Sequence, residues 1–427
     1  MLINAKNTGM MVLVIFNLIS KMAIAQTDWT KHPGNPVLDV GPAGSWDDVF
    51  ATDATVVFNG TIYQMWYTGF DGTKPGIGYA TSPDAISWTK HQGSPVLEVG
   101  PTGSWDALVV AGASILFDGA IYHMWYEGNA SHDRLGYATS TDGISWTKDS
   151  ANPVFEPGPA GSWDSIFIRS PSVLFDGTTF HMWYSGQLGA NFRIGYATSS
   201  DGVNWTKHAG NPVLDVGPAG AWDALWAYQP SVIFNETDSS FHMWYTGRTG
   251  NNFQIGYATS PDGISWTKHS DNPVLSSGGS GSWDALAIFF PEVLFDGTIY
   301  RMWYSGADQA DIERIGYATS SPPTGVTNET DEGIPERFVL FQNYPNPFNP
   351  MTVIRYQLSG PVDVELTIYN QLGQRVKTLV SKRQPAGAYQ IQWDGRDNWE
   401  ELVSSGVYLY RLKAGSFVHA RKMVLLR

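Results

Sequence analysis

Three carboxylates and one arginine interrupt a pattern that is otherwise small, hydroxyl-bearing or apolar at the corresponding places along the chain. They are Asp53, Glu127, Glu292 and Arg169. Two carboxyl groups, one ionised and one held protonated by its surroundings, can act as nucleophile or base and as general acid. An arginine beside them can bind a hydroxyl or a carboxylate. This chemistry is possible only if the fold brings the four side chains together. Whether it does so depends on the segments that carry them.

These segments are copies of one unit of about sixty residues, which occurs five times. Each copy opens with a Trp-Asp pair, and successive pairs are 59, 58, 59 and 61 residues apart. A Met-Trp-Tyr triplet follows, and a Gly-Tyr-Ala-Thr-Ser run comes near the end of the copy. The pairs are Trp46-Asp47, Trp105-Asp106, Trp163-Asp164, Trp222-Asp223 and Trp283-Asp284. A fixed period with this much identity predicts a repeat architecture.

Each unit has the pattern of four short strands. In the third copy they are expected over 171–175, 180–184, 193–199 and 205–207, with Asp-Gly turns after the first and third. The runs are apolar, β-branched and aromatic, which suits a half-buried pleated surface, and Asp-Gly is a strong hairpin signal. Four antiparallel strands repeated radially form a β-propeller blade.

The two ends of this repeat region complete each other. The fifth copy stops at 321 without the Asp-Gly-x-x-Trp-Thr-Lys piece that ends the others, and Asp28-Trp29-Thr30-Lys31-His32 supplies that piece at the start. We therefore predict an all-β chain, with a closed five-bladed β-propeller over 26–321. A linker over 322–335 and a small Ig-like β-sandwich over 336–427 follow, because short alternating strands and Gly-rich turns resume after a polar, Pro-bearing stretch.

Positions that differ between blades are the candidates for function, because positions shared by all five are architectural. Six residues after the Asp of each pair, the blades carry Asp53, Gly112, Ser170, Gln229 and Phe290. One residue earlier they carry Thr52, Ala111, Arg169, Tyr228 and Phe289, and two residues later Thr55, Ser114, Ser172, Ser231 and Glu292. At the end of the second strand they carry Thr68, Glu127, Ser185, Thr246 and Ser305.

We predict that Asp53, Glu127 and Glu292 are catalytic, with Asp53 as nucleophile or base and either glutamate as acid. Arg169, Trp226, Tyr228 and Gln229 are the predicted substrate-binding residues. Each has a structural alternative: Asp53 at a strand start, Glu127 in a solvated loop, and Glu292 paired with Arg169 to fill the pore. Aromatic side chains near the mouth can stack on a ligand or plug the pore, and the two Phe side chains, Phe289 and Phe290, favour the plug.

The five Trp-Asp pairs are expected to be structural, with Asp capping a turn and Trp packing between blades. The alternative is a ring of the five carboxylates around an axial calcium, since calcium prefers oxygen ligands. Histidines recur at repeat positions and are expected to be architectural, so no metal site is assigned to them.

Charge and the chain ends bear on partners and location. The net charge is −14, which makes nucleic acid an improbable partner, and there is no cysteine. Lys6, an apolar run over 10–19 and Ala23-Ile24-Ala25 form the pattern of a signal peptide over 1–25. The run is too short to span a bilayer, so no transmembrane segment is expected after its removal. We expect a monomer.

The C-terminal part resembles a known export signal. FQNYPNPFNP from Phe341, then IYNQLGQRVKTLV, AGAYQIQWDG, SGVYLYRL and the terminal KMVLLR stand in the order of the type A sorting domain of the type IX secretion system. The resemblance implies recognition by the type IX machinery and a secreted or cell-surface location.

The propeller part resembles the five-bladed propeller superfamily of glycoside hydrolase families 32, 43, 62, 68 and 130, through its IGYATSxDGxxWTK and NPVL pieces. In families 32 and 43 the inner strand of the first blade carries a catalytic Asp, and Asp53 matches it. Those families place an Asp in blade two and a Glu in blade three, where this chain has Gly112 and Ser170. The resemblance implies a carbohydrate ligand and hydrolysis of glycosidic bonds by an Asp/Glu pair.

Two other functions fit the same pattern. One is a glycan-binding propeller without catalysis, which the near-identity of the blades favours. The other is an adhesive surface protein whose ligand is another protein.

Overall fold

The structure, a computed structural model, describes residues 27–235, 238–296, 299–320, 338–341, 343, 348 and 351–425. The predicted signal peptide over 1–25 and the linker over 322–335 lie outside these residues. Within the described part of the chain, no helix has the length and apolar character needed to cross a membrane.

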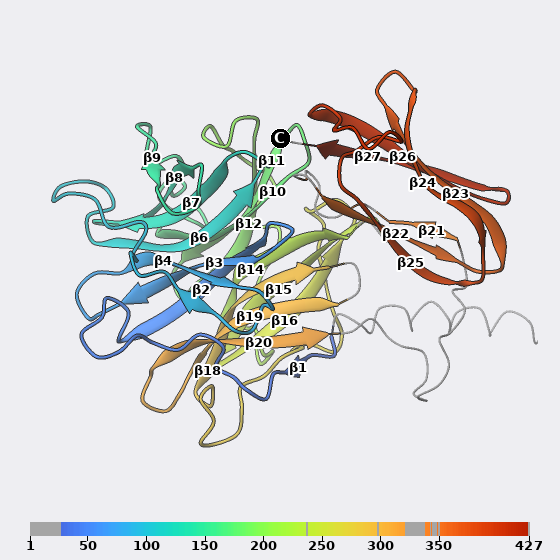
Figure 1. Cartoon of the computed structure of the whole chain (residues 1–427). Coiled ribbons are helices and arrows are strands. Elements are labelled where there is room, and N and C mark those ends of the chain that lie inside the picture. The colour runs from blue at the N-terminus through green and yellow to red at the C-terminus, as the bar shows by residue number, and fades with distance from the viewer. Residues whose placement is uncertain are drawn as a thin grey trace, which may run out of the picture.

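The propeller is built from twenty described strands in five blades (Figure 1). Blade 1 contains β2 (Phe50–Phe58), β3 (Tyr63–Phe70), β4 (Gly76–Ser82) and β5 (Thr89–Lys90), and blade 2 contains β6 (Val109–Phe117), β7 (Tyr122–Asn129), β8 (Asp133–Ser140) and β9 (Thr147–Lys148). Blade 3 contains β10 (Phe167–Phe175), β11 (Phe180–Leu188), β12 (Asn191–Ser199) and β13 (Thr206–Lys207). Blade 4 contains β14 (Trp226–Asn235), β15 (Ser240–Thr249), β16 (Asn252–Ser260) and β17 (Thr267–Lys268). Blade 5 contains β18 (Ala287–Phe295), β19 (Tyr300–Ala307), β20 (Glu313–Ser320) and β1 (Thr30–Lys31).

The first strand of the chain completes the last blade, as predicted. β1 pairs antiparallel with β20, with Thr30 opposite Thr319, and the two lie side by side at the edge of the propeller (Figure 1). Blade 5 also contacts blade 1, since the Trp303 indole donates a hydrogen bond to the Ala85 carbonyl at 3.1 Å. The ring of five blades is therefore closed, and the prediction of an all-β propeller followed by a sandwich is confirmed.

Buried tryptophans hold neighbouring blades together. The Trp of each Met-Trp-Tyr triplet is completely buried. The Trp66 indole of blade 1 donates to the Gly143 carbonyl of blade 2 at 2.8 Å, and Trp125 and Trp183 make the same bond to the next blade. These triplets lie in second strands, and the acceptors follow an Asp in the turn after the third strand, with Ala85 in place of glycine in blade 1. The repeated sequence therefore sets the same spacing between blades.

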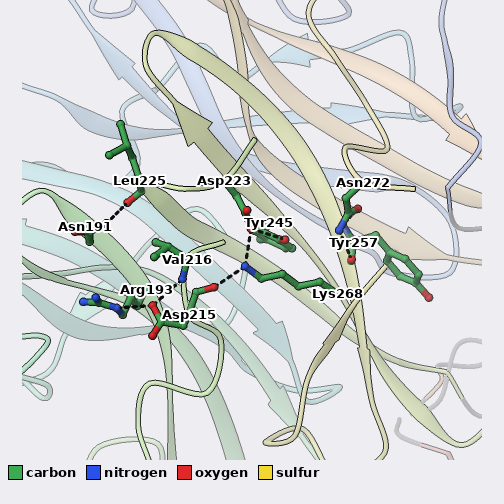
Figure 2. A network of polar contacts seen from close by, with 10 residues as sticks. All are labelled: Asn191, Arg193, Asp215, Val216, Asp223, Leu225, Tyr245, Tyr257, Lys268 and Asn272. Atoms are coloured by element: carbon green, nitrogen blue, oxygen red, sulfur yellow. Dashed lines mark hydrogen bonds and ion pairs between the residues drawn. The ribbon is translucent and has the colours of Figure 1, made fainter. Parts of the chain in front are cut away.

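The Trp-Asp pairs are structural in a way that differs from the expectation. The Trp46 ring packs on Tyr67 and over Gly69 and Gly78 of its own blade, where a side chain on either glycine would collide with it. The Asp is bound by a lysine and a tyrosine of its own blade. Figure 2 shows this for blade 4, where Asp223 accepts from Lys268 at 2.6 Å and Tyr245 at 3.1 Å. We call this arrangement the Lys–Asp–Tyr contact.

All five Lys–Asp–Tyr contacts have the same form. The aspartates are 2 % exposed. Their lysine partners are Lys90, Lys148, Lys207, Lys268 and Lys31, each with its amine 2.6 Å from the carboxylate. A buried charge with a partner and several hydrogen bonds holds the entering loop against the last strand of its blade.

The C-terminal part is a sandwich of two sheets (Figure 1). One contains β21 (Val339–Leu340), β22 (Thr352–Leu358) and β25 (Gly387–Trp393). The other contains β23 (Val362–Asn370), β24 (Arg375–Gln384), β26 (Gly406–Ala414) and β27 (Phe417–Leu425). Ile354, Leu366, Trp393 and Tyr410 are fully buried between the sheets, which accounts for the alternating pattern of these segments.

Candidate functional site

The inner strand of every blade has a bulge at the position that differs most between blades. The pairing of the first and second strands is interrupted there in all five blades. The bulged residues are Asp53, Gly112, Ser170, Gln229 and Phe290, with φ angles of 53°, 53°, 48°, 56° and 51°. Four of the five are not glycine, although this left-handed conformation disfavours a side chain. All five line an axial cavity.

The axial cavity is narrow at this level. It has a volume of about 30 Å³, enough for one or two water molecules. A sugar ring therefore does not fit inside the channel. We call the end of the cavity where the inner strands begin the mouth. Its residues are Thr52, Asp53, Glu127, Arg169, Tyr228, Phe289 and Glu313.

A ring of hydrogen bonds supports the bulges. The N–H of each bulged residue donates to the side chain that ends the second strand of the preceding blade. The acceptors are the hydroxyls of Ser305, Thr68, Ser185 and Thr246 in four cases and the Glu127 carboxylate in the fifth. Because a hydroxyl is sufficient elsewhere, the carboxylate of Glu127 is more than this support requires.

Glu127 is buried, not solvated. Its Oε1 accepts hydrogen bonds from the Ser170 N–H at 2.6 Å and the Ser170 hydroxyl at 3.1 Å, and its side chain belongs to a residue 8 % exposed. Burial raises the pKa of Glu127 to about 7, although the charge of Arg169 opposes this. A carboxyl group with such a pKa is protonated part of the time at neutral pH, as a general acid must be.

Arg169 is held in place by a different acid from the one expected. Its Nε donates to Asp133, and Asn129 donates to the same carboxylate. The guanidinium lies 4.8 Å from the centre of the Phe167 ring. Arg169 does not pair with Glu292, so the predicted pore-filling pair is absent from the described residues. It remains near Glu127, whose charge it balances.

Asp53 faces the cavity and is not engaged by the protein. Its N–H donates to Ser305 at 2.9 Å, but its carboxylate makes no hydrogen bond within the described part of the chain. Burial raises the pKa of Asp53, and the nearby charges of Glu127, Glu292 and Glu313 raise it further. Carboxyl groups this close cannot all be ionised at once, so at least one of them keeps its proton.

Glu292 forms hydrogen bonds between blades inside the ring. Three serines, Ser114, Ser172 and Ser231, accept a backbone N–H of the following blade, and Glu292 does the same for Val56 at 3.2 Å. Its second oxygen accepts from Ser231 at 3.3 Å. Burial raises the pKa of Glu292 to about 7. With both oxygens bonded, its geometry favours a structural role over the catalytic one that we predicted.

The mouth contains a third carboxylate, which the sequence analysis missed. Glu313 begins β20, and burial raises its pKa to about 7, with Thr52 opposing. The signal was a further column of the repeat, at the start of the third strand. It reads Pro75, Asp133, Phe192, Phe253 and Glu313. The two acids and the two aromatic residues of this column either lie at the mouth or contact residues that lie there.

The other half of the mouth is aromatic. Tyr228 lies 4.4 Å from Phe192 and 5.7 Å from Trp226, measured between ring centres. Phe289 and Phe290 continue this surface toward the axis, where Phe290 lines the cavity. Trp226 is half-buried and bonds the Ala190 carbonyl. Burial raises the pKa of Tyr228 to about 12, so its hydroxyl stays protonated and can donate.

The predicted substrate-binding residues are thus partly brought together. Arg169, Tyr228 and Trp226 reach the mouth from blades 3 and 4. Gln229 lines the cavity, but its side-chain oxygen accepts from Thr246 at 2.7 Å and from the Phe290 N–H at 3.0 Å. Gln229 therefore supports the neighbouring bulge, and only its amide nitrogen is left for a ligand.

A wider hollow of about 500 Å³ lies between blades 2 and 3. Its lining residues include His132, Arg134, Glu156 and Phe167, and the Arg169 guanidinium lies over the Phe167 ring. The hollow therefore adjoins the acidic half of the mouth.

The described residues contain no group of three or more His, Asp or Glu side chains placed to hold a metal ion. Each of the five aspartates proposed as calcium ligands takes part in a Lys–Asp–Tyr contact instead. The axial calcium remains an untested prediction.

Comparison with known proteins identifies relatives of both parts of the chain. The family model of beta-1,4-mannooligosaccharide phosphorylases matches residues 187–277, and that of the FlgD Ig-like domain matches residues 350–416. An uncharacterized protein of Mycobacterium tuberculosis is 29% identical over 235 residues, covering 51% of this chain and 75% of that protein. Beta-1,2-mannobiose phosphorylase of Thermoanaerobacter sp. is 28% identical over 142 residues, covering 29% of this chain and 45% of that enzyme.

Solved structures show the same fold. One is a structure from the GH130 family of mannoside phosphorylases, which contains glycoside hydrolases that target beta-1,2 mannosidic linkages in Candida mannan. It has a TM-score of 0.57 at 18% identity and covers 71% of this chain and 96% of its own. A thermostable family-43 glycoside hydrolase has a TM-score of 0.54 at 18% identity, covering 68% and 94%. The two solved structures show the fold of the propeller alone. The family-model match over 187–277 and the similarity to beta-1,2-mannobiose phosphorylase support a relation of the propeller to carbohydrate-active enzymes.

Proposed function

We propose that the propeller cleaves glycosidic bonds of an oligosaccharide or polysaccharide at its mouth, with Asp53 and Glu127 as the reacting pair. The observation that carries this proposal is the free carboxylate of Asp53. It projects from a bulge into the axial cavity, without a hydrogen-bonding partner in the described residues. Structural carboxylates in this fold, such as those of the Lys–Asp–Tyr contacts, are all bonded.

The roles follow from the surroundings of each group. Glu127, with its pKa near 7 and its Oε2 free of the bonds to Ser170, is suited to protonate the leaving oxygen. Asp53 would be the nucleophile or the base, once the proton shared among the neighbouring acids lies on another group. Glu313 takes the place of Glu292 as the third acid near the reacting pair. Trp226, which is half-buried, provides a ring against which a sugar can stack, and Tyr228 packs behind it.

Water is a better acceptor here than phosphate. Two of the relatives are named as phosphorylases, and phosphorolysis would require an anion to bind beside the cleaved bond. The mouth has three acids close together, Asp53, Glu127 and Glu313, and one cation, Arg169, which is already paired with Asp133. Because like charges repel in so narrow a site, the electrostatics favour hydrolysis.

We further infer that the chain is exported, by a signal peptide over 1–25 and a type IX sorting domain over 336–427. The motifs from Phe341 to the terminus support this inference, and the FlgD Ig-like match supports the sandwich that the sorting domain requires. Deleting 336–427 should leave the protein inside the outer membrane of a type IX-competent host, and cell fractionation would show it.

A substrate screen tests the proposed activity. Aryl glycosides and plant and microbial polysaccharides, β-mannosides included, would be incubated with the full chain, with and without inorganic phosphate. Hydrolysis that is lost in Asp53→Asn supports the proposal. Turnover that requires phosphate would contradict the choice of water. Binding without turnover would identify a glycan-binding propeller, the alternative that the near-identical blades favour.

A further inference from the structure

A half-buried arginine lies against two aromatic rings at the outer end of the aromatic half of the mouth. The Arg248 guanidinium carbon is 4.3 Å from the centre of the Trp226 ring and 4.9 Å from that of Phe253. Its Nε donates to the Gly250 carbonyl at 2.7 Å. Within the described ranges, no carboxylate forms an ion pair with it. The guanidinium is therefore fixed in position while its charge is unpaired.

The repeat shows which part of Arg248 the fold needs. The same position in blade 3 is Gln187, whose side-chain amide donates to the Gly189 carbonyl at 2.9 Å. This is the same bond across the same turn as that of Arg248. A glutamine is thus sufficient for the architecture, and the cationic end of Arg248 is additional to it.

The aromatic surface connects Arg248 to the axis. Phe290 lines the cavity beside Asp53, and its ring centre is 5.3 Å from that of Phe289. The half-buried ring of Phe253 lies 6.2 Å from Phe289 and 5.4 Å from Trp226, on which Arg248 lies. A glycan chain that has one sugar at Asp53 can follow these rings outward along blade 4. Its next residues would then lie beside a fixed cation.

We propose that Arg248 binds an anionic substituent of the substrate, the carboxylate of a uronic acid or a sulfate ester, on a sugar outside the cleaved bond. This inference rests on the proposed carbohydrate function. The planar guanidinium can pair two N–H groups with such an anion. Stacking on Trp226 and Phe253 has already restricted its motion, which reduces the entropy lost on binding. The acids around Asp53 repel an anion, so the charged sugar is placed at the rim.

Binding measured by calorimetry tests this subsite, in full-length Asp53→Asn to prevent turnover. The probes are oligogalacturonates with their methyl esters, and carrageenan oligosaccharides with their desulfated forms, so each pair differs in charge. We expect the charged member of one pair to bind about tenfold more tightly. Arg248→Gln should abolish that preference and leave binding of the neutral member unchanged. Arg193→Gln, which removes a cation already paired with Asp215, is the matched control.

The pair that shows the preference separates carboxylate from sulfate. Equal binding of charged and neutral members, a preference that survives in Arg248→Gln, or no binding of either pair would overturn the inference. The proposed hydrolysis has its own readout in the unmodified chain. Cleavage of neutral glycans without an anion preference would refute only the subsite, and an Arg248-dependent preference without any cleavage would refute only the hydrolysis.

Discussion

The Lys–Asp–Tyr contacts and the mouth are two acidic regions of one propeller, and they treat their carboxylates in opposite ways. In the contacts, five aspartates have five lysines, each 2.6 Å away. In the mouth, Asp53, Glu127 and Glu313 share one arginine, which is itself paired with Asp133. The mouth acids are buried without a charged partner for each, and this raises their pKa values. In the contacts, each aspartate has its own lysine, and these ion pairs hold the fold together. The predictions below test this difference.

The largest expected effect is that of removing the free carboxylate. Asp53→Asn should lower kcat/KM by about a thousandfold on whichever glycoside is cleaved, because the amide can act neither as nucleophile nor as base. The backbone N–H bond to Ser305 remains, so the melting temperature should change little. Rate assays and thermal unfolding of the same preparation would check both. Retention of full activity would remove Asp53 from the mechanism.

The second prediction separates the two uses of Glu127. In Glu127→Ser the hydroxyl should still accept the N–H of Ser170, as Ser185 does for Gln229 in the next blade. Folding should therefore survive, while kcat/KM falls about a hundredfold through loss of the acid. Circular dichroism and rate measurements would show the split.

The pH profile gives Glu127 a readout that a structural role would not move. Its pKa is about 7 in the folded protein, and only the protonated form can act as acid. Activity of the unmodified chain should therefore fall as pH rises through about 7. The residual activity of Glu127→Ser should lack this fall. An unchanged profile in the variant would assign the acid to another group, with Glu313 the next candidate.

Much of this arrangement was accessible from sequence, because the repeat supplies its own internal comparison. The spacing of the Trp-Asp pairs predicted the blades, and the displaced segment around Trp29 predicted ring closure. Columns that differ between blades identified Asp53, Glu127 and Arg169. Glu313 was missed because the residues at the start of the third strand were not compared between blades. Side-chain bonding between blades has no sequence signal, so the embedded position of Glu292 could be learned only from the structure.

The next prediction concerns the Lys–Asp–Tyr contacts. Lys268→Met leaves the Asp223 carboxylate buried with a neutral donor, the Tyr245 hydroxyl, as its remaining side-chain partner in the described residues. An uncompensated buried charge is costly, so the free energy of unfolding should fall by about 2 kcal/mol or more. Denaturant titration measures it, with the exposed Lys74→Met as control. Glycan binding by the folded fraction should not change. A loss of binding at unchanged stability would mean that the contacts also serve the ligand.

The smallest effect is expected at Glu292. Both of its oxygens are bonded by the protein, as in the Lys–Asp–Tyr contacts, but its pKa is raised, as in the mouth. Its folded-state pKa of about 7 is above the ordinary value of 4.5. The folded state therefore holds this proton more tightly than the unfolded chain. The resulting contribution to stability is complete below about pH 4.5 and is lost as pH rises through 7.

Glu292→Ser replaces the carboxylate with the hydroxyl that Ser231 uses for the same purpose. The variant should be more stable than the unmodified chain at pH 8, by about 1 kcal/mol, and should lose that advantage at pH 5. Unfolding titrations at the two pH values, together with unchanged kcat/KM at pH 6, would place Glu292 with the architecture. A drop in kcat/KM comparable to that of Glu127→Ser would return it to the reacting groups.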